Sequence, residues 1–362
     1  MASSSSLRFA AAGCVLMLAC FHAGQLLCEP PIAQHTSPAP VTCGTCHVGV
    51  VNAYSHAPMR HAMEQVGANP ALEAHPGLTA NQNGYTYSIS TKDGKSTYTV
   101  SDGSASMTLP IRWILGQQSQ TWMLEKDGHF YESMVSYFHR DQSLSTTPGD
   151  ENIVPHSLSE AMGRKLPIWE VRNCFECHAS GFDPAKDISE QQLTPGLTCE
   201  RCHAGSAQHL SDAVRDVFTT VPKPLRKMDA EQTSAFCGQC HRTWEKVVRE
   251  GWHGPPTVRF QPYRLANSKC FTSGDSRISC IACHDPHHQV NRGDAYYDAK
   301  CLACHSPAQT TVAASAAHSK TCPVAKDKCV SCHMPKIEVA GGHAVFTDHQ
   351  IRVVHSGEPY PN

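Results

Sequence analysis

The chain is short of the side chains that usually build a large core. Aromatic residues make up 7% of its 362 residues and hydrophobic residues 40%, which is lean for a chain of one or two domains. The 24 glycines and 24 prolines favour many turns over long regular elements. Something other than side chains must therefore supply much of the buried apolar surface.

Strong charge of one sign is also missing. The sequence has 30 Lys and Arg against 32 Asp and Glu, a formal net charge of −2 at pH 7. Nucleic-acid binding proteins usually carry a concentrated basic face, and no such stretch is present. We therefore expect no nucleic-acid partner, and we interpret the scattered charges as a solvated surface.

Cysteine, in contrast, is abundant and regularly placed. The pattern Cys-x-x-Cys-His occurs seven times and uses 14 of the 19 cysteines. A random shuffle of this composition would give about 0.06 copies, so composition does not explain the pattern. In chain order, motifs 1 to 7 are Cys43/Cys46/His47, Cys174/Cys177/His178, Cys199/Cys202/His203, Cys237/Cys240/His241, Cys280/Cys283/His284, Cys301/Cys304/His305 and Cys329/Cys332/His333.

This pattern is the attachment signature of c-type haem, in which two thiols add across the haem vinyl groups and the histidine reaches the iron. The alternatives are a zinc-binding cysteine pair and a redox-active dithiol. Zinc would need four ligands and gives no reason for a histidine after every second cysteine. We therefore predict seven covalently bound haem c groups, with the seven histidines as proximal iron ligands. Their porphyrins would form the core and provide the missing apolar bulk, and the chain without haem should fold poorly.

Histidines outside the motifs are candidates for the second, distal iron ligand. His209 follows motif 3 too closely to reach across its own haem, so we expect it to serve a neighbour. His287 suits the haem after motif 5, and we expect His349 to return and clamp a haem other than that of motif 7. The distal candidates are His349, His287, His209, His343, His61, His56 and His318.

The positions of the motifs and turns divide the chain. An apolar run from Phe9 to about Leu27 predicts an export leader, with an uncleaved membrane anchor or lipidation at Cys20 as alternatives. In each case the folded part lies outside the cytoplasm, in the periplasm or at the outer-membrane or extracellular surface. The predicted segments are a signal peptide or membrane leader at 1–28, a Pro/Ser/Thr-rich spacer at 29–42, a first haem segment at 43–78, an antiparallel β module at 79–140, a linker and helix at 141–173, and a six-haem domain at 174–362.

Residues 79–140 contain no cysteine. Alternating stretches flank Lys92-Asp-Gly-Lys95, which predicts a hairpin with an Asp-Gly turn, and a further strand is predicted over residues 129–138. Helices are predicted at Val48–Met63 and, after the capping box that starts at Ser157, at Ala161–Lys165. We expect a mainly α and irregular multihaem cytochrome c fold organised around seven haems, with a small antiparallel β insertion.

The six later motifs are closely spaced. Successive proximal histidines from His178 to His333 are 25, 38, 43, 21 and 28 residues apart, which leaves little protein between cofactors and predicts haems in near contact. Two cysteines outside the motifs, Cys270 and Cys322, predict a disulfide in an oxidising compartment, with two free thiols as the alternative.

Several strings together resemble exported multihaem cytochromes of the cytochrome c-554/c-prime type. This resemblance implies mostly bis-histidine haems in stacked and perpendicular pairs, and distal ligands at His209, His287 and His349. The loop after motif 3 departs slightly from the usual pattern, with Cys-His-Ala-Gly-Ser in place of Cys-His-Gly-Pro-Gly. The strings are Tyr131-Glu-Ser-Met-Val-Ser-Tyr-Phe, Ala161-Met-Gly-Arg, Cys174-Phe-Glu-Cys-His, Gly196-Leu-Thr-Cys-Glu-Arg-Cys-His, Arg259-Phe-Gln-Pro-Tyr-Arg-Leu, Cys280-Ile-Ala-Cys-His-Asp-Pro-His and Cys329-Val-Ser-Cys-His-Met-Pro-Lys.

We predict a carrier that moves electrons between redox partner proteins. One alternative is a multihaem oxidoreductase with an open-coordination haem acting on a small nitrogen or oxygen compound, expected at motif 1 with His75, Arg112 or Arg140 nearby. A second is a haem-stacked filament subunit, which would make the protein an oligomer. All seven motifs end in His, so none carries the lysine that marks the catalytic haem of pentahaem nitrite reductases, and no tyrosine cross-link motif is visible. No catalytic residue is therefore assigned.

Overall fold

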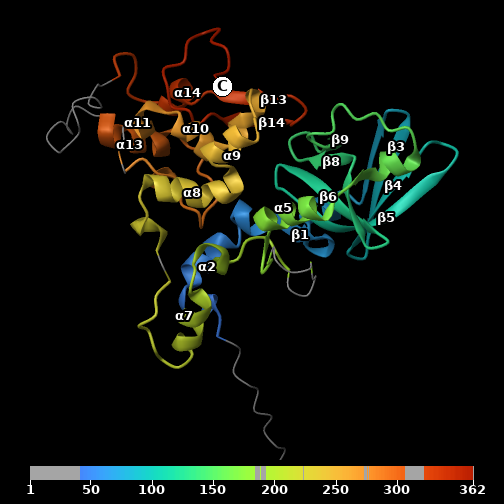
Figure 1. Ribbon diagram of the computed structural model, residues 1–362, viewed down its shortest axis with the longest axis horizontal. Coiled ribbons are helices and arrows are strands. Elements are labelled where there is room, and N and C mark those ends of the chain that lie inside the picture. Colours follow the sequence, from blue (N-terminus) through green and yellow to red (C-terminus); the bar gives the residue numbers. More distant parts are fainter. Residues whose placement is uncertain are drawn as a thin grey trace, which may run out of the picture. The chain divides into compact units, whose positions relative to one another are not determined.

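The computed structural model describes residues 41–361 apart from 184–187, 189–192, 223, 273–274, 276 and 306–321 (Figure 1). These residues belong to the second of two compact units, Val41–Asn362. The predicted leader, the spacer up to residue 40 and His318 lie outside the described residues. None of the helices in the described ranges has the length and apolar character needed to cross a membrane.

One antiparallel sheet occupies most of the chain between motifs 1 and 2, and we call it the β module. Its strand order is β10-β7-β6-β5-β4-β3-β2, with β1 beside β5 and β8 beside β6 and β9. It runs from residue 63 to residue 165, so it is larger than the small insertion predicted at 79–140. Its strands are β1 (Met63–Gln65), β2 (Gly77–Gln82), β3 (Tyr85–Lys92), β4 (Lys95–Ser101), β5 (Ser106–Leu115), β6 (Ser119–Lys126), β7 (His129–Ser133), β8 (Val135–Phe138), β9 (Ser143–Thr146) and β10 (Gly163–Lys165).

Local turn chemistry sets the hairpins of this sheet. Asp93 and Gly94 have φ of 52° and 69°, the two positive values that a type I′ turn requires. Lys92 pairs with Lys95 across that turn, which confirms the predicted hairpin. The predicted strand over 129–138 is instead divided at Met134 into β7 and β8, which pair with different parts of β6.

The helices are short and cluster around the motifs. The prediction of a helix at Val48–Met63 was wrong beyond Tyr54, because Pro58 disfavours helical backbone before it. The helices are α1 (Cys43–Cys46), α2 (Val48–Tyr54), α3 (Pro70–Ala74), α4 (Leu158–Met162), α5 (Ile168–His178), α6 (Cys199–Cys202), α7 (Ser206–Ala213), α8 (Ala230–His241), α9 (Trp244–Arg249), α10 (Gln261–Ala266), α11 (Lys269–Thr272), α12 (Cys280–Cys283), α13 (Asp294–His305) and α14 (Cys329–His333).

Short 3₁₀ turns and two small hairpins complete the fold. The helix predicted at Ala161–Lys165 ends at Met162, and Gly163, with φ of 152°, begins β10. The remaining elements are η1 (Pro58–His61), η2 (Val66–Ala68), η3 (Leu225–Lys227), η4 (Pro255–Arg259), β11 (Ala179–Ser180) paired with β12 (Thr194–Pro195), and β13 (Lys336–Val339) paired with β14 (Ala344–Thr347).

Buried apolar side chains are concentrated in the β module. Tyr87, Tyr98 and Trp122 are 0% exposed there and belong to one large cluster. In the described part of the chain after residue 180, eight hydrophobic residues are buried. These are Leu197, Ala230, Val247, Val258, Tyr263, Leu265, Val339 and Ala344. Five of the seven motifs lie in this stretch, and its side chains alone form too small a core. This is expected if porphyrins supply the rest of the core.

Candidate haem-binding site

Every motif occupies a helical turn, which places both cysteines on one face because residues three apart are neighbours on a helix. Motifs 2, 4 and 6 form the last turn of the longer helices α5, α8 and α13, whereas motifs 1, 3, 5 and 7 lie on the isolated turns α1, α6, α12 and α14. Even-numbered and odd-numbered motifs are therefore built differently.

Three odd-numbered motifs place their proximal histidine opposite a second histidine. An imidazole nitrogen lies about 2 Å from a bound metal ion, so two ring centroids on opposite sides of one iron should be about 6 to 6.5 Å apart. All three observed separations match, so each pair fits a bis-histidine haem. The pairs are His47 with His209 at 6.4 Å, His203 with His287 at 6.0 Å, and His284 with His349 at 6.1 Å.

The second histidine of each pair follows a later motif by a fixed rule. His209 follows motif 3 and faces motif 1, His287 follows motif 5 and faces motif 3, and His349 follows motif 7 and faces motif 5. Motifs 1, 3 and 5 are thus each joined to the second motif that follows them. Sequence reasoning assigned these three histidines to neighbouring haems but did not identify the pairing.

Hydrogen bonds at Nδ1 orient several of these rings. The Nδ1 atom of His209 lies 2.6 Å from the Thr220 carbonyl oxygen, and that of His349 lies 3.0 Å from the carbonyl oxygen of Thr347. A backbone carbonyl accepts from Nδ1–H, which leaves Nε2 free for a metal. These contacts therefore favour iron ligation through Nε2.

The other predicted distal ligands have different partners. Both ring nitrogens of His61 are engaged, by Glu64 at 2.7 Å and by the Ser55 carbonyl oxygen at 2.7 Å, so we do not retain it as a ligand. His343 pairs with Asp141 at 2.6 Å and its ring packs on Phe138, so it joins β13–β14 to the β module. The exposed His56 has Nδ1 3.0 Å from the Asn52 carbonyl oxygen and faces no proximal histidine among the described ring contacts.

Thiols of different motifs lie in direct contact and reveal which motifs are neighbours. Four hydrogen-bonded pairs link motif 1 to 3, 2 to 4, 4 to 5 and 6 to 7. Electrostatic contacts of Cys202 with Cys237 and of Cys283 with Cys301 add the links from 3 to 4 and from 5 to 6. The seven motifs therefore form one connected set, in which motif 4 contacts motifs 2 and 5 and interacts electrostatically with motif 3. The hydrogen-bonded pairs are Cys43 with Cys199, Cys177 with Cys240, Cys237 with Cys280, and Cys301 with Cys329.

The motif cysteines differ in exposure. Twelve of them are partly buried, whereas Cys46 and Cys332 are exposed. The Sγ of Cys332 lies 3.8 Å from the hydroxyl oxygen of the adjacent Ser331. Motifs 1 and 7 lie at the two ends of the line of motifs, so Cys43 and Cys329 face the neighbouring motif while Cys46 and Cys332 face outward.

A cavity of about 330 Å³ lies beside motif 2. Among its lining residues His178 is the single histidine, and its Nδ1 lies 2.7 Å from the carbonyl oxygen of Ala62. The wall is completed by residues of the β module and α5 and by Arg259. The lining residues that bear on chemistry are Cys174, His178, Met123, Glu132, Thr121, Thr147 and Arg259. This cavity suits a haem attached at motif 2. Sequence reasoning missed the residues that line it opposite the motif, because they come from distant strands.

A buried ion pair holds the chain next to His349. Arg264 and Asp348 are both 0% exposed, and the guanidinium donates two hydrogen bonds to the carboxylate at 2.8 and 2.9 Å. Arg352 donates a third at 2.8 Å, and the Tyr360 ring lies 4.4 Å from the Arg264 guanidinium carbon. Burial raises the pKa of Asp348, but the hydrogen bond and charge of Arg264 outweigh it and hold that pKa below its usual value.

The disulfide predicted between Cys270 and Cys322 is not formed in the described part of the chain. Cys322 is exposed. Burial raises the pKa of the Cys270 thiol, and the charge of Cys304 in motif 6 raises it further. Cys270 is therefore placed among the motifs, while Cys322 is placed toward solvent.

Comparison with known proteins agrees with the motif assignment. Residues 135–204 match the model of the family described as cytochrome c554 and c-prime, and this segment contains motifs 2 and 3. No curated protein matches the chain. A solved structure, the outer cell wall cytochrome OcwA, is similar at 17% identity and a TM-score of 0.45, over 86% of this chain and 78% of that chain.

The attachment motifs and the family match identify the chain as a multihaem c-type cytochrome. This class carries covalently bound haem c, and the cysteines of the motifs would hold it. Haem c supplies one-electron chemistry at iron, so the protein is an electron-transfer cytochrome.

Proposed function

We propose that the protein is a heptahaem cytochrome that passes electrons between redox partner proteins through closely packed, mostly bis-histidine haems. The observation that carries this proposal is the connected set of motifs, in which sulfurs that would anchor neighbouring haems touch. The chain's own residues hold each iron, fix the imidazole orientation through Nδ1 and exclude water. Bis-histidine ligation favours low reduction potentials.

The contacts favour a branched path. Motifs 1, 3, 4, 5, 6 and 7 follow one another through thiol hydrogen bonds or, between 3 and 4 and between 5 and 6, through electrostatic interaction of their cysteines. Motif 2 joins this line at motif 4 through Cys177 and Cys240. The Sγ of Cys177 is also 3.8 Å from the carbonyl oxygen of Gln239, inside motif 4. We infer that electrons pass along the line and reach motif 2 as a side branch.

We also propose that the protein works outside the cytoplasm, in the periplasm or at the cell surface. The leader-like segment at residues 1–28 and the covalent attachment of haem support export. We propose that its redox partners are proteins. The hypothesis includes membrane attachment through the N-terminus and self-association.

The haem count and the ligation are directly testable. Mass spectrometry of the mature holoprotein should show seven haem additions, and every haem should accept one electron reversibly in a spectroelectrochemical titration. Ferric haems with two histidine ligands should be low-spin by electron paramagnetic resonance. A mass with fewer additions, or haems that cannot be reduced, would contradict the proposal.

The cavity at motif 2 favours a second candidate function, an oxidoreductase with an open iron position. No second histidine is among the lining residues of that cavity, which holds instead the Arg259 cation and the hydroxyls of Thr121 and Thr147. For this second function we therefore propose the open haem at motif 2, in place of the motif 1 haem expected from the sequence. Of the residues predicted to line it, Arg112 pairs with Glu125 and Arg140 with Glu338, and neither belongs to the cavity.

For this second function we expect one high-spin ferric haem that binds cyanide, while the other haems stay low-spin. Replacing Met123, the thioether in the cavity wall, with leucine should leave that signal unchanged. If the wild type is entirely low-spin and Met123→Leu creates the high-spin haem, Met123 is the sixth ligand and the open-site hypothesis fails.

A further inference from the structure

A buried carboxyl group lies behind the wall of the motif 2 cavity. Thr147 and Pro148 line the cavity together with Cys174 and His178. The backbone N–H of Asp150 donates to the Thr147 carbonyl oxygen at 3.0 Å, so Asp150 is directly behind this wall. Its side chain has 5% of its surface exposed, and its Oδ2 atom has no hydrogen-bond partner among the described residues. An ionised carboxylate in such a place is poorly stabilised.

The surroundings of Asp150 are mainly acidic. Glu132 lines the cavity and bonds Arg164 at 2.6 Å, and the same guanidinium also bonds Glu170. One arginine thus bonds two carboxylates directly, and its charge also acts on Asp150. The charged and titratable groups that face Asp150 are Glu132, Glu151, Glu170, Arg164 and Tyr98. Burial, followed by the charge of Glu132, raises the pKa of Asp150 to about 6.

The acidic cluster also acts on the haem attachment site. The charges of Glu132 and Glu170 act on the sulfur of Cys174, which would anchor the haem of motif 2. Electrostatic coupling is reciprocal, so a negative charge added at motif 2 must disfavour ionised carboxylates in the cluster. Asp150 is the carboxylate that takes up a proton most easily, because its Oδ2 atom has no counter-ion contact or hydrogen bond among the described residues.

We propose that Asp150 takes up a proton from solvent when an electron reaches motif 2 and releases it when that electron leaves, an inference that rests on the proposed electron-transfer function. The electron would come from the haem held at the neighbouring motif 4, and a haem held at motif 2 by Cys174, Cys177 and His178 would supply the one-electron chemistry. One proton enters from water and forms the O–H bond of the Asp150 carboxylic acid. The net charge near the cavity is then unchanged, and electron arrival there depends on pH.

The test compares proton uptake by the wild-type holoprotein and Asp150→Asn during complete reduction in weakly buffered solution. Near pH 6 to 7 the wild type should bind as much as one more proton per molecule than the variant. The potential of one haem should fall with rising pH toward a limit of about 59 mV for each tenfold change in proton concentration, and the variant should lose this dependence.

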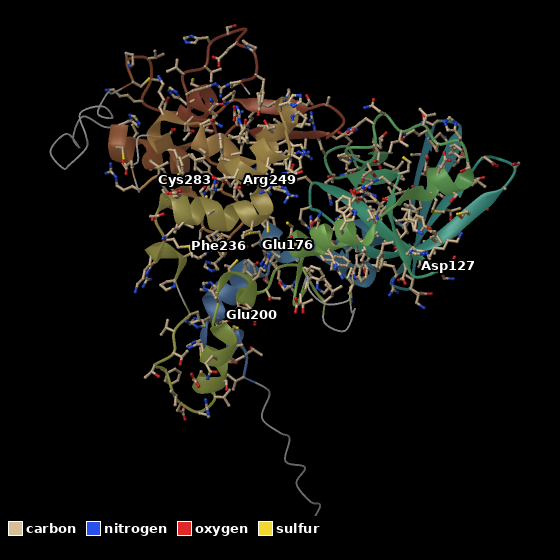
Figure 2. All side chains as sticks on the ribbon, in the orientation of Figure 1. Asp127, Glu176, Glu200, Phe236, Arg249 and Cys283 are labelled. Atoms are coloured by element: carbon tan, nitrogen blue, oxygen red, sulfur yellow. The ribbon has the colours of Figure 1, made fainter. Side chains whose placement is uncertain are left out.

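Asp127→Asn is the matched control. Asp127 is exposed in the turn between β6 and β7, labelled in Figure 2, and its φ of 53° is one that asparagine also adopts. This variant should keep the wild-type proton uptake. Should Asp150→Asn fail to assemble, Glu132→Gln provides an independent test, because removing that charge should move the pH of maximal uptake downward.

Equal uptake by the wild type and Asp150→Asn, with every haem reduced normally, would overturn this inference and leave the electron-transfer proposal intact. Haems that cannot be reduced in the wild type would overturn both.

Discussion

Replacing Asp348 with alanine should destabilise the protein by about 3 to 5 kcal/mol, the usual effect of removing one partner of a buried ion pair. The Arg264 guanidinium, 0% exposed, would lose both of its hydrogen bonds to the carboxylate. Arg352, which also bonds Asp348, would lose a partner as well. Chemical denaturation of the holoprotein at neutral pH measures the change in the free energy of unfolding.

The same substitution should alter one haem. Asp348 directly precedes His349, whose ring faces that of His284 at 6.1 Å. Loosening this segment should free the sixth position at motif 5, so we expect one additional high-spin ferric haem in the folded variant. A change in stability without any change in spin state would separate the ion pair from the positioning of His349.

An exposed ion pair gives the control for this experiment. Arg140 and Glu338 pair at 2.9 Å, but their side chains are 54% and 63% exposed, and such pairs contribute about 1 kcal/mol or less. Glu338→Ala should therefore be nearly neutral. If it destabilises the protein as much as Asp348→Ala, burial of the Arg264 pair has no special effect.

The pH dependence of this ion pair has a definite sign. The folded-state pKa of Asp348 lies below its unfolded value, so its stabilising contribution is complete above about pH 4 and is lost as the pH falls through the folded value. The difference in stability between the wild type and Asp348→Ala should accordingly shrink in acid.

The sequence predicts well the features that depend on neighbouring residues. A Cys-x-x-Cys-His motif needs one helical turn, and the Asp93-Gly94 turn sets its own hairpin register through positive φ values. The boundaries of the β module could not be found in this way. Strands β1 and β10 have three residues each and exist because they pair with β5 and β7, far away in the chain.

Side-chain partners were harder to predict than motifs. His61 and His209 are both distal candidates in the sequence, but Glu64, three residues away, engages the first ring and the long-range fold brings the second to motif 1. Arg264 belongs to a string that supports the family resemblance, yet nothing local indicates that its partner is Asp348, 84 residues later. Only long-range packing determines such pairs.

Replacing His209 with alanine should convert the haem of motif 1, and not that of motif 3, to a high-spin ferric state. His209 follows motif 3 in sequence, but its ring faces His47 at 6.4 Å. Electron paramagnetic resonance of the holoprotein should therefore show one new high-spin haem. His129→Ala is the control. His129 is exposed at the start of β7 and faces no motif histidine among the described ring contacts, so this variant should show no new high-spin haem.

Deleting individual haems identifies which one His209 serves. Removal of the motif 1 cysteines, by Cys43→Ala and Cys46→Ala, eliminates that haem, and His209→Ala should then create no further high-spin iron. In a chain that instead lacks the motif 3 cysteines Cys199 and Cys202, the substitution should still create one. Such non-additivity is the mark of two groups in one site. The opposite pattern would assign His209 to motif 3. It would contradict the rule that motifs 1, 3 and 5 each receive a distal ligand from the segment after the second motif that follows them.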